Sequence, residues 1–410
     1  MIIEAVSTRW ITAQIGAREH YLPPVALARH GRLACCFTDF WAGPGWRWAG
    51  RHLPRLHSAA NRYEKGLEPH RMISFNAGAL FKTLVQRYRR QNGLTSLYEF
   101  HRMYGEWFST KVRNVLKRRP IDGGRFCYVG FTTGSLETVQ YLREHGVFCA
   151  VQQIDPARTE YEMILEEARL WPGWESNPGQ IPPSYFARLD QEWQTSSLVI
   201  VNSEWSRQAL IEQGVPAAKL VVIPLGYESP LGYTPPVRAS AGRPLRVLWL
   251  GSVILRKGIP YLIEAARKLK KRRITFLIAG PIGINLAAIQ DLPNNIEFLG
   301  SIARDDVPNI VALADAYVLP TISDGFALTQ LEAMAQGLPV ITTPNCGRVV
   351  THGKDGFVVP VRDSSRLAEV IAQLDDDRDL LARMAAETQK TVQRFSINNF
   401  GTQLLACGPN

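Results

Sequence analysis

Apolar positions in the second half of the chain form short continuous runs that alternate with amphipathic stretches. The run Leu245–Leu250 (LRVLWL) ends at Gly251 and precedes the helical pattern Ile259–Leu269. The alternation continues, with strands predicted at 275–279, 296–299, 316–319, 338–342 and 357–360 and helices at 305–313, 327–336 and 364–374. Continuous apolar strands that alternate with helices are typical of a parallel sheet covered on both faces. This half is therefore predicted to be a doubly wound, Rossmann-like α/β domain.

The first half shows the same alternation less regularly. Strands are predicted at 127–129, 148–151, 198–201 and 220–223, and helices at 136–145 and 204–213. The segment 41–123 is rich in Trp, Arg and Pro, fits the alternation poorly, and is predicted to be an insertion. The predicted fold class is α/β, with two Rossmann-like doubly wound domains facing each other across a cleft. Open α/β sheets bind ligands at the carboxyl ends of their strands, so this cleft is the expected ligand site.

A change in composition separates the two halves. Tyr227–Pro244 (YESPLGYTPPVRASAGRP) is rich in Pro, Gly and Ser, as is typical of an interdomain linker. The 410 residues then divide into an N-terminal domain at 1–226, a linker at 227–244 and a C-terminal domain at 245–390. Residues 391–410 form a tail that is expected to pack back toward the N-terminal domain.

The chain carries a formal charge of +10, and many of its cations gather in three clusters. These clusters are Gln86–Arg90 (QRYRR), Lys111–Arg119 (KVRNVLKRR) and Lys268–Arg273 (KLKKRR). They are either solvated helix faces or a surface that attracts an anionic partner, such as a membrane or a phosphorylated substrate. No Cys/His finger spacing and no RNP-type aromatic motif accompanies them, so nucleic-acid binding is not expected.

One of these clusters also contains apolar residues in a helical pattern. Val112, Val115 and Leu116 lie between the cations of Lys111–Arg119, which on a helix gives an apolar strip beside a cationic one. Such a strip is expected of a segment at a membrane interface. It is also expected of an ordinary amphipathic helix packed on its own domain. The first interpretation predicts reversible contact with an anionic membrane.

Cysteine usage and hydropathy bear on the cellular compartment. None of the six cysteines forms a CxxC pair, and most lie in apolar strand-like runs, so buried free thiols in a reducing cytoplasm are expected. No run approaches the roughly 18 apolar residues that a transmembrane helix needs. The first ten residues lack the pattern of a signal peptide. The predicted location is the cytoplasm, with peripheral contact at the inner membrane surface as a further option.

The stretch at residues 251–265, GSVILRKGIPYLIEA, has the composition of an anion-binding loop. It places Arg256 and Lys257 in a loop between a strand and a helix that Gly258 opens. A helix N-terminus presents unpaired N–H groups, so two cations beside it make a plausible diphosphate clamp. The alternative is a pair of ordinary surface cations. Neither the Walker A spacing nor GxGxxG is present, so the loop predicts neither a P-loop nor a nicotinamide site.

A second stretch, SDGFALTQLEAMAQG at residues 323–337, contains two carboxylates eight positions apart. Asp324 is predicted to lie in the loop after a strand, and Glu332 to lie in the apolar helix that follows. An unpaired buried carboxylate is costly, so Glu332 needs a partner. Glu332 is either a salt-bridged or solvent-facing acid, or it accepts hydrogen bonds from the vicinal hydroxyls of a sugar.

Taken together, these stretches resemble the GT-B glycosyltransferases of the large retaining group called family 4, or glycosyl transferases group 1. The resemblance covers GSVILRKGIPYLIEA, FLGSI, VALADAYVLPTISDGFALTQLEAMAQGLPVI and HGKDGFVVPVRD in the second half. It also covers LVIVNSEWSRQALIEQGVPAAKLVVIPLGYE in the first half. The family signature EGFG…LEAMA reads DGFA…LEAMA in this chain, so an Asp stands where the family has its first Glu.

The resemblance implies a role for each matching residue. Glu332 matches the acid that binds the ribose hydroxyls of a sugar nucleotide, and Asp324 matches the acid that contacts the transferred sugar. Lys257 matches the phosphate-binding lysine. Ser252 stands where the family usually has an arginine, and Arg256 is a candidate to replace it.

In the first domain, Gly16 matches the glycine-rich loop after the first strand and is predicted to open a helix directly. Asp155 follows the strand at 148–151, where the family often has a histidine; it either caps a turn or contacts the sugar. The predicted catalytic residues are Asp324, Lys257 and Asp155. The predicted donor-binding residues are Gly16, Ser252, Arg256, Lys257, Gly280, Asp324, Gly325, Phe326, Ala327, Leu328 and Glu332.

The function that the resemblance implies is retaining transfer of a sugar from a nucleotide-sugar donor to a hydroxyl acceptor. The acceptor is a carbohydrate, a lipid-linked sugar or a small molecule, and neither a metal nor another cofactor is expected. The alternatives are a nucleotide-sugar epimerase, a phosphorylase, and a catalytically degenerate scaffold that binds a glycan or a partner.

Overall fold

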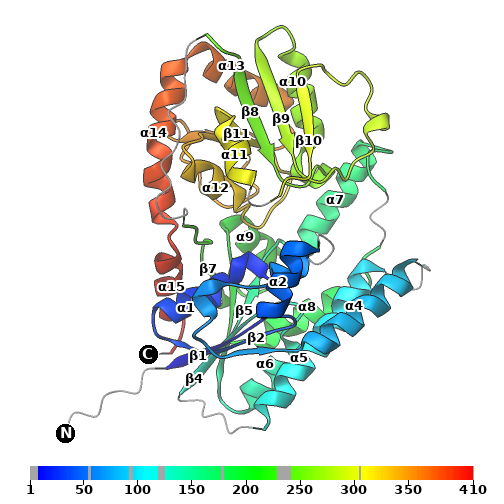
Figure 1. The fold of residues 1–410 in the computed structure, drawn as a ribbon, viewed down its shortest axis with the longest axis vertical. Helices are drawn as coiled ribbons and strands as arrows, with labels where there is room; N and C mark the ends of the chain where they lie inside the picture. The colour runs from blue at the N-terminus through cyan, green and yellow to red at the C-terminus, as the bar shows by residue number, and fades with distance from the viewer. Residues whose placement is uncertain are drawn as a thin grey trace, which may run out of the picture.

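The computed structural model describes residues 8–53, 57–91, 96–118, 125–176, 180–228, 242–303 and 306–409. The described residues form two parallel sheets with helices on both faces (Figure 1). The fold is the two-domain α/β arrangement that the alternating pattern predicted. Most of the predicted linker, residues 229–241, lies outside the described residues.

The first sheet has seven strands in the order β3-β2-β1-β4-β5-β6-β7, all parallel. The strands are β1 Arg9–Gln14, β2 Leu33–Thr38, β3 Met72–Ser74, β4 Phe126–Phe131, β5 Phe148–Gln153, β6 Leu198–Val201 and β7 Leu220–Val222. The helices of this half are α1 Leu22–Arg29, α2 Pro44–His52, α3 His57–Ala60, α4 Asn76–Gln91, α5 Leu97–Leu116, α6 Leu136–Glu144, α7 Arg158–Leu170, α8 Pro183–Thr195 and α9 Glu204–Glu212.

The second sheet has six parallel strands in the order β10-β9-β8-β11-β12-β13. The strands are β8 Leu245–Leu250, β9 Ile274–Ala279, β10 Ile296–Gly300, β11 Ala316–Leu319, β12 Val340–Thr342 and β13 Gly356–Val358. The helices are α10 Ile259–Lys268, α11 Val307–Ala312, α12 Thr329–Ala335, α13 Ser364–Asp376, α14 Arg378–Arg394 and α15 Ile397–Ala406.

Each sheet reverses its strand order at one point. In the second sheet β8 pairs with both β9 and β11, and Ala316 lies opposite Val247. In the first sheet β1 pairs with both β2 and β4. Loops that leave the carboxyl ends of two such strands diverge to opposite faces of the sheet, which opens a place for a ligand between them.

The segment around 41–123, predicted to be an insertion, is built into the first domain. Its strand β3 pairs with β2, and its long helix α5 packs against α6 and α8. Buried Phe108, Val112 and Leu116 of α5 belong to the core of this sheet. The sequence pattern did not show this role, because β3, the only strand in the described part of the segment, is three residues long and too short to stand out from the Trp-, Arg- and Pro-rich composition around it.

Helix α5 corrects the prediction of an interfacial strip in Lys111–Arg119. Val112 and Leu116 are 0% and 6% exposed, and both pack inside the domain. The apolar strip therefore faces the protein, and the interpretation of an ordinary amphipathic helix is the right one. Lys117 lies over the ring of Tyr141. No helix in the described part of the chain is both long and apolar enough to cross a bilayer.

The C-terminal tail crosses from the second domain to the first. Helix α14 runs along one side of the molecule and α15 continues onto the first domain (Figure 1). There α15 packs on α1, and Gly401 lies so close to His30 that a larger side chain would overlap it. The backbone N–H of Tyr227 donates to the carbonyl of Phe395 at 2.7 Å. The last helix thus ties the two domains together beside the start of the predicted linker.

Candidate active site

Glycines shape the loop that leaves β8. Gly251 and Gly280, which end β8 and β9, both have φ of 143°, and a Cβ on Gly280 would overlap the carbonyl of Gly251. Gly258 has φ of 82° and starts α10; a Cβ there would overlap the carbonyl of Pro320 in the loop after β11. Only glycine allows these close approaches. The two loops at the switch point of the second sheet therefore lie in direct contact.

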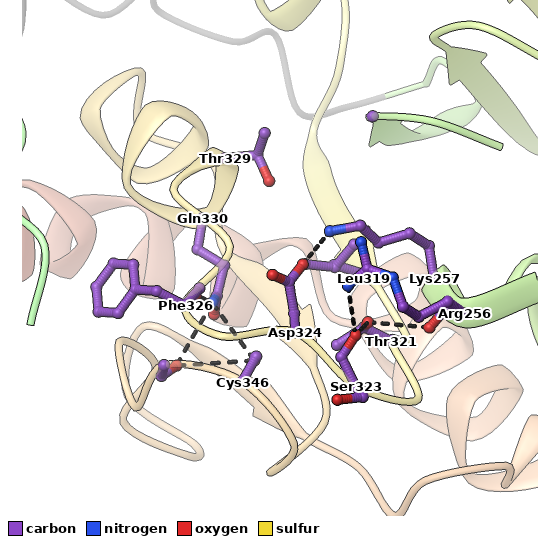
Figure 2. A network of polar contacts seen from close by, with 12 residues as sticks. Arg256, Lys257, Leu319, Thr321, Ser323, Asp324, Phe326, Thr329, Gln330 and Cys346 are labelled. Atoms are coloured by element: carbon purple, nitrogen blue, oxygen red, sulfur yellow. Dashed lines mark hydrogen bonds and ion pairs between the residues drawn. The ribbon is translucent and has the colours of Figure 1, made fainter. Parts of the chain in front are cut away.

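Between these glycines, Arg256 and Lys257 lie in the 3₁₀ turn Leu255–Lys257. The Lys257 side chain points at the carboxylate of Asp324 and pairs with it (Figure 2). Both side chains are largely buried, at 18% and 14% exposed. Burial opposes ionisation of Asp324, but the charges of Lys257 and Arg256 hold its pKa below the usual value. The predicted clamp lysine and the predicted sugar-contacting acid are therefore one ion pair.

Arg256 points across to the first domain. Its guanidinium donates to Glu160 of α7 at 3.2 Å and to the carbonyl of Ser323 at 2.9 Å. The Ser323 hydroxyl also donates to Glu160, at 3.0 Å. Burial raises the pKa of Glu160 to about 7 against the lowering effect of Arg256, and the charges of Asp155 and Asp324 add to the rise. Arg256 is thus shared between the predicted clamp and a contact between the domains.

The two domains also touch through the loop that carries the signature. A Cβ on Gly325 would overlap the carbonyl of Ile154, which already accepts a hydrogen bond from Asn202 at 2.9 Å. The indole of Trp205 donates to the hydroxyl of Ser323 at 3.1 Å. The carboxyl ends of the two sheets therefore meet at Asp324, and the glycine after it is required by the approach of the first domain.

Glu332 is half-buried on α12, among buried Leu331, Ala333 and Met334. Its charge reaches the hydroxyl of Tyr317 on β11: burial raises the pKa of that hydroxyl, and the carboxylates of Glu332 and Asp324 raise it further. Tyr317 donates to the Thr329 hydroxyl at 2.7 Å. Glu332 and Asp324 therefore both act on the same buried hydroxyl.

The residues between these two acids form a tight turn. Ala327 has φ of 59°, a left-handed conformation at the position where the family signature has glycine. Its N–H is a hydrogen-bond donor to the Asp324 carboxylate. Buried Phe326 packs so close to Gly347 that a Cβ there would overlap its ring, and Gln330 donates to the Phe326 carbonyl at 2.9 Å (Figure 2). Leu328 directly precedes α12 and is half-buried.

Another predicted donor residue, Ser252, lies at the protein surface. Ser252 is exposed at the start of the β8 loop. Its position fits the family's loop, but its side chain is too short to replace a guanidinium. In the second domain, the cations at the switch point are therefore Arg256 and Lys257.

In the first domain, the loop after β1 differs from its prediction. The sequence predicted a helix that opens directly after Gly16. Instead Arg18–Tyr21 form a 3₁₀ turn in which residues 19, 20 and 21 have φ of 49°, 54° and 60°, and α1 begins at Leu22. Pro23 and Pro24 lack an N–H and suit the first turn of a helix, which explains the later start.

Gly16 itself is held by Asp39. Its N–H donates to the buried carboxylate at 2.8 Å, and its φ of 75° favours glycine. The same carboxylate accepts from Arg62 at 2.7 Å and from the Tyr104 hydroxyl at 2.9 Å. Asp39 was not singled out in the sequence, because these three partners come from segments far apart along the chain.

Asp155 forms the turn before α7. Its carboxylate accepts from the amide of Gln153 at 2.8 Å and from the backbone N–H of Ala157 at 2.9 Å. Its charge also acts on Arg256 and Glu160. Asp155 therefore caps a turn, and its negative charge acts on Arg256 and Glu160, which form the contact between the two domains.

The described residues contain no group of three or more His, Cys, Asp or Glu side chains that could hold a metal ion.

The second domain matches the family model "Glycosyl transferases group 1" over residues 244–377. The amylovoran biosynthesis glycosyltransferase AmsK of Erwinia amylovora is 26% identical over 219 residues, covering 50% of this chain and 53% of AmsK. The putative colanic acid biosynthesis glycosyltransferase WcaL of Escherichia coli is 26% identical over 242 residues, covering 55% and 59%. Residues 244–377 of this chain are therefore similar to the group 1 glycosyltransferases.

Solved structures agree on the fold of this protein. HepE of Anabaena, in complex with UDP and glucose, superposes with a TM-score of 0.59 at 18% identity and covers 98% of this chain and 99% of HepE. The sucrose-phosphate synthase of Thermosynechococcus elongatus gives 0.64 at 18% identity, with 97% of each chain covered. The predicted two-domain GT-B fold is thereby confirmed. The matched region spans just over half the length of AmsK and WcaL.

One helix terminus of the first domain is already filled by a side chain. Glu192 is fully buried and accepts from the backbone N–H groups of Thr133, Ser135 and Leu136 at the start of α6. Burial raises the pKa of Glu192 to about 7, against the lowering effect of Arg188. A ligand phosphate therefore cannot use this helix end, which lies at the switch point of the first sheet. In the second domain, by contrast, two cations, Arg256 and Lys257, precede the helix α10 at the switch point.

A pocket of about 280 Å³ lies beside that switch point. Its wall combines cationic, amide and aromatic side chains. The lining residues are Ile15, Arg18, Asp39, Arg62, Thr83, Gln86, Phe100, His101, Tyr104, Thr133 and Tyr185. The ring of Tyr185 contacts that of Tyr98, with 5.3 Å between the ring centroids. Burial raises the pKa of the Tyr98 hydroxyl; the charge of Glu160 raises it further, and the charge of Arg256 lowers it. The aromatic pair of Tyr98 and Tyr185 therefore links the pocket to the contact between the domains.

Proposed function

We propose that this protein is a glycosyltransferase that moves a sugar from a nucleotide-sugar donor to a hydroxyl acceptor, with retention of configuration and without a metal. The observation that carries the proposal is the buried ion pair of Lys257 and Asp324 at the switch point of the second sheet, with Glu332 on the helix that follows Asp324. This combination supplies a cation for a diphosphate, an acid for a sugar and an acid for a ribose.

In this proposal Glu332 accepts hydrogen bonds from the ribose hydroxyls, and the diphosphate lies against Lys257. Arg256 adds positive charge where the leaving diphosphate gains negative charge, so two cations do the work that a metal ion does in other enzymes. Asp324 is placed to contact the transferred sugar. The leaving phosphate then takes the proton of the attacking hydroxyl on the same face of the sugar, which keeps the configuration at the reacting carbon.

The acceptor is proposed to enter the pocket of the first domain. Two of its lining residues, Tyr104 and Tyr185, offer flat aromatic faces suited to a sugar ring. AmsK and WcaL are named for polysaccharide biosynthesis, and a carbohydrate acceptor follows by analogy. The donor is a UDP- or GDP-sugar by the same reasoning. HepE is solved with UDP-glucose, and a relative from Mycobacterium tuberculosis, 28% identical over 220 residues, is named as GDP-mannose-dependent.

The test is a thermal-shift screen of the purified protein against UDP-, GDP-, ADP- and dTDP-sugars, followed by an assay of nucleoside diphosphate release. One donor at about a hundred times its Kd should stabilise the fold by about 2.7 kcal/mol. Lys257→Ala should abolish this shift, while Lys270→Ala, an exposed cation of the same domain, should leave it unchanged. No shift and no hydrolysis with any donor would overturn the proposal.

A binding scaffold is the second candidate, because Asp324 holds Lys257 within the protein. The same assays separate the two functions. A scaffold shows the thermal shift without releasing nucleoside diphosphate in the presence or absence of sugar acceptors. An enzyme shows both effects, and Asp324→Ala reduces the release while the thermal shift with the free nucleoside diphosphate is kept.

A further inference from the structure

Helix α4 exposes its apolar side to solvent. Phe81, Leu84 and Tyr88 are 66%, 65% and 66% exposed, and Leu80 and Val85 add 38% and 37%. At about 100° per residue, all five fall on one side of the helix. They form a continuous surface, called here the α4 apolar face. The helix lies at the outer edge of the first domain (Figure 1).

The opposite side of α4 borders the pocket of the first domain instead. Thr83 and Gln86, opposite the α4 apolar face, line the pocket of the first domain, and buried Ala79 packs beside them. A surface helix normally turns its apolar stripe to the core and its polar residues to water. The orientation of α4 is therefore reversed, and its neighbour α5 shows the normal one. Contiguous exposed apolar patches of this kind mark surfaces that are covered by something else.

The charges around the α4 apolar face indicate what covers it. Helix α4 contains four cations and no acid in its sequence, NAGALFKTLVQRYRRQ. Arg87 lies on one flank of the apolar face, and Lys82 and Arg89 lie on the other. None of these three forms a salt bridge with another described residue. Their charges are therefore available to an external anion.

We propose that the α4 apolar face docks on an anionic bilayer surface. Phe81, Leu84 and Tyr88 enter the boundary between headgroups and acyl chains, while Lys82, Arg87 and Arg89 contact anionic headgroups on both flanks. An apolar face between two cationic flanks is the arrangement that lies in a membrane interface. Because the other side of α4 lines the pocket, docking places that pocket beside the bilayer surface. The proposal needs no assumption about sugar transfer.

The test is sedimentation of the full-length protein with phosphatidylcholine vesicles, with and without a third of phosphatidylglycerol. The protein should bind only the anionic vesicles, and binding should weaken as salt screens the cations. Lys82→Gln/Arg87→Gln/Arg89→Gln removes three cations and should weaken partition by roughly a hundredfold. Phe81→Ser/Leu84→Ser, which keeps every charge, should weaken it by at least about tenfold.

Matched controls change the same chemistry elsewhere. Lys270→Gln/Lys271→Gln/Arg273→Gln removes three exposed cations from the second domain, and Leu170→Ser/Leu313→Ser removes two exposed leucines. Both controls should bind anionic vesicles within about twofold of the native chain, since their side chains lie outside the proposed contact. Unchanged melting temperatures show that each variant is folded.

Three results would overturn the proposal. The first is no binding to anionic vesicles at low salt. The second is an equal loss of binding in the second-domain controls, which would mean that net charge alone is responsible. The third is concentration-dependent self-association, measured by analytical ultracentrifugation, that Phe81→Ser/Leu84→Ser abolishes while vesicles bind neither form. That result would assign the α4 apolar face to a second copy of the chain.

Discussion

The ion pair between Lys257 and Asp324 makes an unusual prediction for the substitution Asp324→Asn. The carboxylate occupies the lysine on which the donor diphosphate is proposed to lie, and both side chains are largely buried. A diphosphate that binds this protein must therefore displace the carboxylate, or share the lysine with it against the repulsion of two anions. Removing the charge of Asp324 removes both obstacles.

The size of the effect follows from the contact. A hydrogen bond to a charged group contributes about 1.5–3 kcal/mol net, and two unit charges about 4 Å apart interact by about 4 kcal/mol at an effective dielectric constant of about 20. Asp324→Asn should therefore raise the affinity for the free nucleoside diphosphate by about tenfold to a hundredfold. It should lower the free energy of unfolding by about 2 kcal/mol, because a nearly buried lysine loses its partner. Sugar transfer should fall, since Asp324 is proposed to contact the sugar.

Isothermal titration calorimetry with UDP and GDP measures this change directly. Asp379→Asn, an exposed acid on α14, is the matched control and should leave the affinity unchanged. In a Lys257→Met background the gain from Asp324→Asn should shrink, because no cation remains to be released. Weaker nucleotide binding in Asp324→Asn would refute the reasoning, since it would mean that Asp324 supports the diphosphate rather than competing with it.

Three further predictions address the same site. Glu332→Gln should keep the melting temperature and weaken nucleotide binding by about tenfold to a hundredfold in calorimetry; a lower melting temperature with unchanged affinity would make Glu332 structural. Ala327→Gly should raise the unfolding free energy by about 1 kcal/mol, because glycine relieves the left-handed backbone. Ala333→Gly, inside α12, should lower the unfolding free energy by about as much. If both substitutions change the unfolding free energy in the same direction, the backbone explanation is wrong. For Glu160 the folded pKa of about 7 exceeds the ordinary 4.5, so the folded state holds the extra proton and loses stability as pH rises from about 4.5 to 7. Glu160→Gln should flatten that fall in urea unfolding series at several pH values, and an unchanged slope would remove Glu160 from the pH response.

Sequence alone determined the layered fold and singled out the residues of the loops after β8 and β11. Buried parallel strands read as continuous apolar runs, and β8 runs from Leu245 to Leu250 as the pattern predicted. The family signature singled out Lys257, Asp324 and Glu332, because local spacing after a strand places side chains at the carboxyl edge of a sheet. These features depend on neighbours within one or two elements, which is the range that a sequence pattern can report.

Tertiary structure alone decided how those residues are paired and which helix faces are covered. Lys257 and Asp324 are 67 residues apart, and Arg256 and Glu160 are 96 apart, so no local pattern links them. Helices α4 and α5 have similar amphipathic sequences, yet α5 buries its apolar side and α4 exposes it. Periodicity shows that a helix has an apolar side, but only packing against the rest of the chain decides whether that side faces the core, because burial depends on what the fold places next to it.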